Sequence, residues 1–208
     1  MLYLCANVQN CVLGYCQSDE ISLLLVDYKT LESMPWFGNQ VEKMVSVSAS
    51  LATLEFNRQF RKNYRQWWQT VIVGSTTELP QKYYERFGAY DNSNNHGATF
   101  DSRVFCLPKE EVTNYFYWRQ LDAIRNSINS VGQSNFSSKE LQNKGCNDVK
   151  GMLAEKGIVW DELPINEQRG VCCRKEVDAD GRSRWMIDTS IPVFCGEGRE
   201  YIDRLVVE

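Results

Sequence analysis

Two apolar, β-prone runs near the beginning of the chain are separated by only three polar residues. Residues 11–16 form the first run, residues 20–28 form the second, and Gln17-Ser18-Asp19 lies between them. Runs of this length and composition, joined by so short a polar segment, predict an antiparallel β-hairpin. The tip of the predicted hairpin carries an acid pair, Asp19 and Glu20.

Apolar residues recur at helical spacing in two long stretches farther along the chain. The first stretch, residues 36–65, follows Pro35 and predicts a long helix, because proline is favoured in the first turn. The second stretch opens at residue 109 and predicts another long helix. Ser137 and Ser138 are suitable caps for a third helix over residues 139–153.

The remaining segments predict shorter elements. Residues 1–9 are apolar and lack a cap, so we expect the last turns of a helix there. Residues 69–97 are rich in Gly, Asn, Ser and Thr and predict a loop or an insertion, whereas residues 99–107 predict a strand that Pro108 ends. Residues 169–175 and 184–188 predict a terminal hairpin that turns at Asp180-Gly181.

Composition limits the class of protein. A chain of 208 residues with 43% hydrophobic residues is long enough for one domain with a genuine core, or for one domain plus a small appendage. The formal net charge of −4 excludes a histone-like condenser of nucleic acid, so any contact with nucleic acid must come from a local patch. Since no apolar run is long enough to span a membrane and no leader precedes a cleavage site, we expect a soluble, cytoplasmic protein.

Cysteine and histidine usage argues against two kinds of site. The eight cysteines include no C-x-x-C pair, so a zinc ribbon is not predicted and most of them are expected in the core. Cys172 and Cys173 are neighbours in a predicted strand, so their side chains should point to opposite faces. His96 is the single histidine and no patterned nucleophile accompanies it, which disfavours a hydrolase triad.

The second half of the first long helix has a distinctive composition. Basic residues alternate there with aromatic ones, namely Arg58, Arg61, Lys62 and Arg65 with Phe60, Tyr64, Trp67 and Trp68. Such a face can grip RNA phosphates and stack bases. The simpler interpretation, which we favour at this stage, is a solvated helix end with an aromatic underside, because aromatic residues at helical spacing usually belong to a core.

The acid pair at the hairpin tip is the feature best suited to chemistry. Carboxylates at the mouth of an antiparallel sheet hold Mg²⁺ in palm-type nucleotidyltransferases. Asp19 and Glu20 are adjacent, so they face opposite sides and cannot both bind one ion. Asp27 lies eight residues farther, about 26 Å along an extended strand, and is excluded. Asp101 is a possible partner, although an acid pair in a surface turn is by itself most often structural.

Four segments together resemble one family of enzymes. They are residues 14–22 (Gly-Tyr-Cys-Gln-Ser-Asp-Glu-Ile-Ser), 37–50, 100–105 (Phe-Asp-Ser-Arg-Val-Phe) and 117–123 (Tyr-Trp-Arg-Gln-Leu-Asp-Ala). In this order they resemble the tRNA(His) guanylyltransferase family, most closely its bacterial and phage-type tRNA-repair branch.

The resemblance implies a fold and an activity. The fold is α+β, a polymerase-like palm of ferredoxin-like βαββαβ order whose first strand is absent here, with C-terminal helices and a terminal β-hairpin. Residues 1–108 would form a partial palm, and residues 109–208 the helical and hairpin region. The implied enzyme is a homo-oligomer, a tetramer in the family. It adds nucleotides to tRNA 5′ ends in the 3′-to-5′ direction, with ATP or GTP and Mg²⁺.

Roles for single residues follow from the matched positions. Asp19 and Glu20 would be catalytic, with Asp19 as metal ligand and Glu20 supporting the turn. Ser18 and Asp19 would contact the nucleotide, and Lys43 would bind its phosphates.

Two asparagines, Asn126 and Asn147, match polar positions of the tRNA or activation site. Ile124 and Cys146 stand where eukaryotic guanylyltransferases carry a histidine and a lysine, so the resemblance favours repair over guanylation of tRNA(His).

Two classes of function remain open. The family's first strand, with its Asp-Gly-(Lys/Arg) sequence, should precede residue 1 and lie between the strands at 20–28 and 99–107. One hypothesis is therefore an enzyme of which this chain is an N-terminally truncated form. The other is a catalytically inactive module that binds tRNA or a partner. A nucleotide cyclase is disfavoured by Trp118-Arg119-Gln120 and by the terminal hairpin.

Overall fold

The computed structural model describes residues 1–73, 79–177 and 180–207. It divides into two compact units. The sheet unit comprises Met1–Pro35 and Cys106–Glu208, and the helical unit comprises Trp36–Phe105. The division into a palm region and a C-terminal region at residue 108 stays a prediction.

The sheet unit combines four strands with a set of mostly short helices, so the predicted α+β class is confirmed. Its elements in chain order are α1 (Leu2–Asn7), β1 (Cys11–Gln17), β2 (Glu20–Leu25), α4 (Lys109–Asn135), α5 (Ser138–Leu141), α6 (Cys146–Glu155), η3 (Trp160–Glu162), α7 (Ile165–Arg169), β3 (Val171–Val177), β4 (Ser183–Asp188), η4 (Gly196–Arg199) and α8 (Glu200–Val207).

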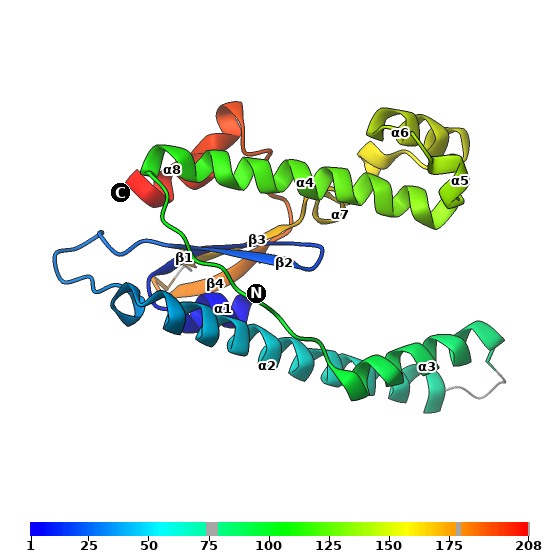
Figure 1. Ribbon diagram of the computed structural model, residues 1–208, viewed down its shortest axis with the longest axis horizontal. Coiled ribbons are helices and arrows are strands. Elements are labelled where there is room, and N and C mark those ends of the chain that lie inside the picture. Colours follow the sequence, from blue (N-terminus) through cyan, green and yellow to red (C-terminus); the bar gives the residue numbers. More distant parts are fainter. Residues whose placement is uncertain (74–78, 178–179, 208) are drawn as a thin grey trace. The chain divides into compact units, whose positions relative to one another are not determined.

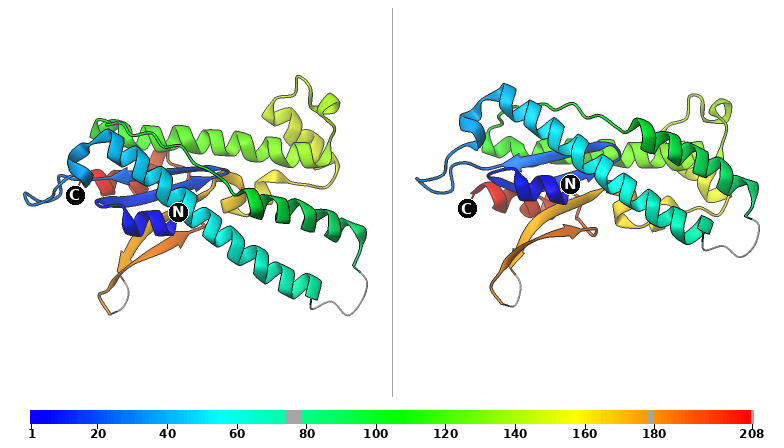
Figure 2. Two further views of the ribbon diagram at one scale, coloured as in Figure 1. Left: turned by 60° about the horizontal axis from the view of Figure 1, so that its bottom comes forward. Right: turned by 90° about the horizontal axis from the view of Figure 1, so that it is seen from below.

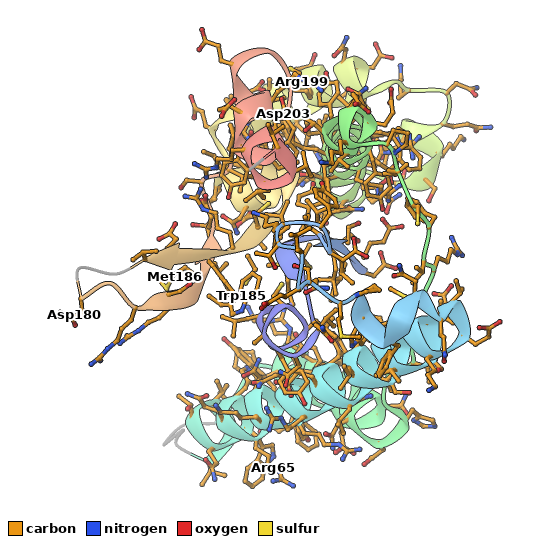
Figure 3. The ribbon with its side chains drawn as sticks, turned by 90° about the vertical axis from the view of Figure 1, so that its left-hand side faces the viewer. Arg65, Asp180, Trp185, Met186, Arg199 and Asp203 are labelled. Carbon is orange, nitrogen blue, oxygen red and sulfur yellow. The ribbon has the colours of Figure 1, made fainter. Side chains whose placement is uncertain are left out.

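The four strands form one antiparallel sheet in the order β2-β1-β3-β4 (Figure 1). Both predicted hairpins are therefore present, and β1 joins them by pairing with β3. The β3–β4 hairpin projects beyond the helices of its unit (Figure 2), and Asp180 marks its tip (Figure 3). Among the described residues β2 pairs only with β1, so β2 lies at one edge of the sheet.

One face of the sheet packs against α4 and α8, and this layer forms the main core (Figures 1 and 2). Tyr15 of β1 is almost completely buried, and its ring meets Phe116 of α4 and Phe194 edge to face, with centroid separations of 6.3 and 5.8 Å. Ile202 of α8 is fully buried in the same cluster. Large rings in such contacts stabilise a core through buried area and ring geometry together.

The opposite face of the sheet is covered by α1, which contacts β1, β3 and β4. Gly14 lets α1 approach β1 closely, because a side chain there would collide with Cys5. Cys173 hydrogen-bonds with Cys5 on this face, whereas Cys172 belongs to the main core, so the expected opposite orientation of the two neighbours is confirmed. Cys5, Cys11, Cys172 and Cys173 are buried, while Cys106 and Cys195 are exposed.

A smaller cluster holds α6 against the second half of α4, around Ile128, Leu153 and Trp160. The predicted third helix over 139–153 is wrong in its continuity, because the chain forms two helices there. Ser137 caps α5 through a capping box with Glu140. Asn143 then adopts a left-handed φ of 60°, which ends α5 before α6 begins.

The helical unit is built on two helices and a following extended segment. Its elements are η1 (Trp36–Asn39), α2 (Val41–Trp67), the π-helical turn η2 (Trp68–Val73) and α3 (Gln81–His96). Helix α2 confirms the predicted first long helix. None of the helices in the described part of the chain combines the length and apolar character that a bilayer span requires.

Within the segment 69–97, for which a loop or an insertion was predicted, helix α3 shows that residues 81–96 are not a loop. Residues 74–78 of this segment lie outside the described residues. The aromatic side chains of α3 meet those of α2: Tyr90 contacts Phe60 and Trp67 edge to face, and Phe87 lies 6.1 Å from Tyr64 between ring centroids. The Asn- and Ser-rich composition of this segment disfavours an isolated helix, but aromatic packing against α2 overrides that local preference.

The strand predicted over residues 99–107 is also wrong, because these residues form no strand. Polar side chains of α2 take up backbone groups of this segment instead. Asn57 both donates to the carbonyl of Ala98 and accepts from its N–H, each at 2.8 Å, and Thr53 accepts from the N–H of Phe100 at 3.1 Å. Bonded in this way, the segment lies along α2 and needs no ladder partner for those groups.

Candidate functional site

The turn between β1 and β2 is tight and strained. Gln17 and Glu20 are the last paired residues of the two strands, so only Ser18 and Asp19 form the turn. Ser18 adopts a φ of 49°, a left-handed conformation that is uncommon for residues other than glycine. Backbone strain of this kind clusters at functional sites, where the surrounding structure maintains it.

Glu20 is anchored to α4. Its carboxylate accepts from Gln17 Nε2 at 2.8 Å and forms an ion pair with Arg119. The Arg119 side chain is only 11% exposed, and it also pairs with Asp122 at 3.2 Å. The guanidinium therefore ties the hairpin tip to α4, and both contacts engage Glu20 through its Oε2.

Asp19 is the carboxylate at the tip that remains available. It is exposed and makes no hydrogen bond or ion pair with any described residue. Among the described residues, no group of three or more His, Cys, Asp and Glu side chains could hold a metal ion. The tip thus supplies one carboxylate, which fits a Mg²⁺ ion that takes its other ligands from nucleotide phosphates and water.

A pocket of about 340 Å³ opens beside the turn, between the hairpin tip, α4 and α7. Gln17 and Ser18 line it from the hairpin, Asn126 and Ser130 from α4, and Glu167 from α7. Gln17 is 5% exposed, and its Oε1 is buried without a hydrogen-bond partner among the described residues. A buried acceptor left unpaired is costly, so a ligand that donates a hydrogen bond would be favoured there.

The wall formed by α7 is held by polar bonds. Ser127 donates to the carbonyl of Glu167 at 2.6 Å and accepts from the Trp160 indole at 3.0 Å. Gly170, with a φ of 84°, follows α7 and lies so close to the carbonyl of Cys16 that a Cβ would stand 2.5 Å from that oxygen. Only glycine permits this approach, which sets the distance between α7 and the hairpin tip.

The structure brings some of the predicted site residues together. Ser18 and Asn126 line one pocket, and Asn126 donates to Asp122 at 3.4 Å, so it joins the network that holds Glu20. Asn147 is exposed in the first turn of α6 and is not among the residues that line this pocket. Lys43 is exposed near the start of α2, in the helical unit.

The two other carboxylates considered from the sequence are placed elsewhere. Asp101 belongs to the helical unit, where it pairs with Arg103 at 3.3 Å. Asp27 comes after the last residue of β2, at the end of the hairpin opposite the tip.

Three residues of this site carry no role in the sequence-based reading: Gln17, Arg119 and Gly170. The signals were weak, because a glutamine before a turn and a glycine before a strand are common. Arg119 offered the better signal, since it stands within an apolar-patterned helix where a charge requires a partner.

Comparisons with known proteins support the resemblance. The model of the tRNA(His) guanylyltransferase family matches residues 2–108 of the chain. An uncharacterized protein of Acanthamoeba polyphaga mimivirus, R259, is 25% identical over 194 residues, which cover 87% of this chain and 61% of that protein. The chain therefore spans less than two thirds of the length of that relative.

Two solved structures are similar along the whole chain. A bacterial tRNA(His) guanylyltransferase (Thg1)-like protein in complex with ATP is 37% identical, with a TM-score of 0.79, and the match covers all of this chain and 76% of that one. A bacterial protein of the same description in complex with GTP is 34% identical, with a TM-score of 0.69, and the match covers 100% of this chain and 74% of that one.

Proposed function

Because the chain belongs to the tRNA(His) guanylyltransferase family, whose members are nucleotidyltransferases, we propose that it is a tRNA 5′-end nucleotidyltransferase working in the 3′-to-5′ direction, in tRNA processing or 5′-end repair. The observation that carries this proposal is the pocket beside the hairpin tip. It joins Ser18 and Asn126, two matched family positions, around the unpaired acceptor of Gln17.

The pocket residues suit a nucleotide. Gln17 Oε1 would accept from a base amino group or a ribose hydroxyl, and this bond would satisfy a buried atom. Ser18 and Asn126 would donate to phosphate or sugar oxygens. Their side chains sit on a strained turn and on α4, so their positions are set before the ligand arrives.

Two further kinds of contact are proposed, one to the metal ion from the sheet unit and one to phosphate from the helical unit. Asp19 would be the protein's ligand to Mg²⁺, which when bound would neutralise charge on the reacting phosphates. Glu20 would keep the turn in place through Arg119. Lys43 would bind triphosphate oxygens as a point charge, and Asn147 would contact tRNA or the activating nucleotide.

The remaining proposals concern the substrates, the oligomeric state and the cellular location. The proposed substrates are a tRNA with an incomplete 5′ end and ATP or GTP. We also propose a homo-oligomer and a cytoplasmic location.

One observation favours the alternative, a catalytically inactive module that binds tRNA or a partner. Among the described residues the hairpin tip has a single carboxylate without a partner, because Glu20 is engaged by Arg119 and Gln17. Catalysis by two metal ions ordinarily needs more than one such ligand.

The decisive experiment measures nucleotide addition. A 5′-truncated tRNA transcript with a 5′-monophosphate is incubated with labelled ATP or GTP and Mg²⁺. One arm uses the 208-residue chain, and a second uses the same chain prefixed with a family-type strand that ends in Asp-Gly-Lys. Labelled tRNA in either arm supports the enzyme, provided that Asp19→Ala abolishes it. Tight tRNA binding without extension in both arms would favour the binding module.

A further inference from the structure

Helix α2 separates its aromatic and basic side chains onto different faces. Phe60, Tyr64 and Trp67 are half-buried and meet rings of α3, so this row belongs to the interior of the helical unit. The expected aromatic underside is thus observed for these three rings, whereas Trp68 is 38% exposed. These ring contacts assign no role to the basic residues.

Those basic residues line a groove of the helical unit. The groove measures about 1190 Å³ and is bordered by α2 and by Thr99 and Phe100 of the extended segment. Among the described residues, four cations and no acid line the groove; the cations are Arg58, Arg61, Lys62 and Arg65. A concentration of positive charge at one place contrasts with the formal net charge of −4 for the whole chain.

The spacing of the cations keeps them on one side of the helix. Positions 58, 61, 62 and 65 follow the i, i+3, i+4, i+7 order, and together they extend about 10 Å along the axis. Like charges at i and i+4 repel and destabilise a helix by about 0.2–0.5 kcal/mol per pair. Two such pairs occur in α2, namely Arg58 with Lys62 and Arg61 with Arg65.

The acid nearest in sequence relieves only one of these charges. Arg58 pairs with Glu55 at 2.8 Å. Arg61, Lys62 and Arg65 are exposed and form no ion pair with an acid among the described residues; Arg65 is labelled at the lower edge of α2 in Figure 3. Their charge is therefore available to an external anion.

We propose that this groove binds the sugar–phosphate backbone of RNA, and that it is a contact surface for the tRNA substrate outside the pocket at the hairpin tip. The identification of the RNA as tRNA rests on the proposed function. Because the rings of α2 are used in packing, contact would be made to phosphates rather than by base stacking, so binding would be independent of sequence.

Charge favours RNA over a protein as the occupant. The centres of protein–protein interfaces are poor in charged residues, and lysine is depleted there. Surfaces that bind nucleic acid instead concentrate Lys and Arg, and neutral donors such as Gln66 and Gln69 add hydrogen bonds to phosphate and sugar.

Salt dependence of binding tests the proposal directly. The variant R61Q/R65Q removes two cations of the groove while keeping polar side chains and helix propensity. The control K82Q/R86Q removes two exposed cations of α3 that do not line the groove. The dissociation constant of the 208-residue chain for a 5′-truncated tRNA transcript is measured without nucleotide between 50 and 300 mM KCl, and circular dichroism checks that each variant is folded.

We expect only the groove variant to lose affinity for RNA. Each phosphate contact contributes roughly 0.7–0.9 to the slope of log K against log salt, so R61Q/R65Q should flatten the slope by roughly 1.4–1.8 and weaken binding about 25- to 60-fold at 0.1 M salt. K82Q/R86Q should change neither quantity, and R61K/R65K should restore both. The same loss for a 20-nucleotide poly(U) strand would support backbone recognition.

Three results would overturn the proposal. They are an unchanged slope in R61Q/R65Q, an equal change in K82Q/R86Q, and displacement of the RNA by polyglutamate at the same charge concentration, which would show a general anion surface. Failure of the proposed function is distinguishable, because it would abolish nucleotide addition while leaving this binding difference intact.

Discussion

The core of the sheet unit contains aromatic rings that are almost completely buried, whereas several aromatic rings of the helical unit stay partly in solvent. Tyr15, Phe116 and Phe194 are at most 2% exposed, but Phe56 is 47% exposed and Tyr90 is 38% exposed. The sheet unit therefore depends on buried area and close packing. The helical unit depends more on ring contacts and on hydrogen bonds from α2 to the backbone of residues 98–100.

This difference in packing matches the different roles that we propose for the two units. A site that must hold Ser18 in a strained turn needs rigid surroundings, and the core beneath β1 provides them. A surface that binds a polyanion through its charges does not need such a core. The helical unit can therefore tolerate the exposed charges of Arg61, Lys62 and Arg65, which would be destabilising inside the core of the sheet unit.

The largest effect that we expect is on catalysis at the sheet unit. Asp19→Ala should reduce Mg²⁺-dependent nucleotide addition by at least about 1000-fold, because the site would lose its available anionic ligand. Glu197→Ala, which removes an exposed acid of the same unit, is the matched control and should keep full activity. Isothermal titration should likewise show weaker binding of the Mg²⁺-nucleotide complex by Asp19→Ala and unchanged binding by Glu197→Ala. Equal losses in both variants would contradict the role of Asp19.

A pair of phenylalanines compares the stability of the two units. Phe116→Ala should lower the free energy of unfolding by about 3–5 kcal/mol, since it leaves a cavity in the main core. Phe56→Ala should cost about 1 kcal/mol or less, because that ring is half exposed. Urea denaturation measures both. If the two losses were similar, the contrast in packing would not govern stability.

Alkaline pH should lower the free energy of unfolding of the sheet unit. Burial raises the pKa of the Cys172 thiol, and a hydrogen bond with Cys11 raises the pKa of Cys5 from 9.0 to about 12. A raised pKa means that the unfolded chain ionises first, so stability is intact below pH 9 and falls as pH rises toward the folded pKa.

The expected slope is about 1 kcal/mol per pH unit above 9 for each such thiol. Urea denaturation at pH 8 and pH 10 should show the decrease for tryptophan and tyrosine signals of the sheet unit. The variant Cys172→Ala should have a smaller decrease. A pH-independent midpoint would contradict the prediction.

The smallest effect concerns substrate binding through the helical unit. Lys43→Ala should raise KM for the nucleoside triphosphate roughly 3- to 10-fold with little change in kcat, since a solvated point charge contributes modest binding energy. Its melting temperature should not change, because Lys43 is exposed. Lys29→Ala, at an exposed cation of the sheet unit, serves as control. A lower melting temperature with an unchanged KM would show that Lys43 is structural.

The success of the sequence-based predictions depended on how local each signal was. The β1–β2 and β3–β4 hairpins were predicted because short polar turns between apolar runs specify pairing between neighbouring segments. The long helices α2 and α4 were predicted for a similar reason, since their apolar periodicity extends over many turns.

Where a segment takes its partners from distant residues, the prediction failed. Helix α3 forms on the rings of α2, although its own composition indicates a loop. Residues 99–107 have strand-like composition, but Asn57 and Thr53 of α2 take up part of their backbone hydrogen bonds. Propensity is a weak prior, and tertiary contacts of this kind override it.

For the site, the amino-acid sequence alone determined the hairpin tip, its two acids and the family, because these depend on neighbouring residues in fixed order. Only the tertiary structure decided what each acid is free to do. Arg119 lies 99 positions from Glu20 in the chain, yet it engages Glu20 and leaves Asp19 available. The pocket likewise needs Gly170 beside Cys16, a contact between distant segments. Such contacts arise from packing in three dimensions, which no local pattern encodes.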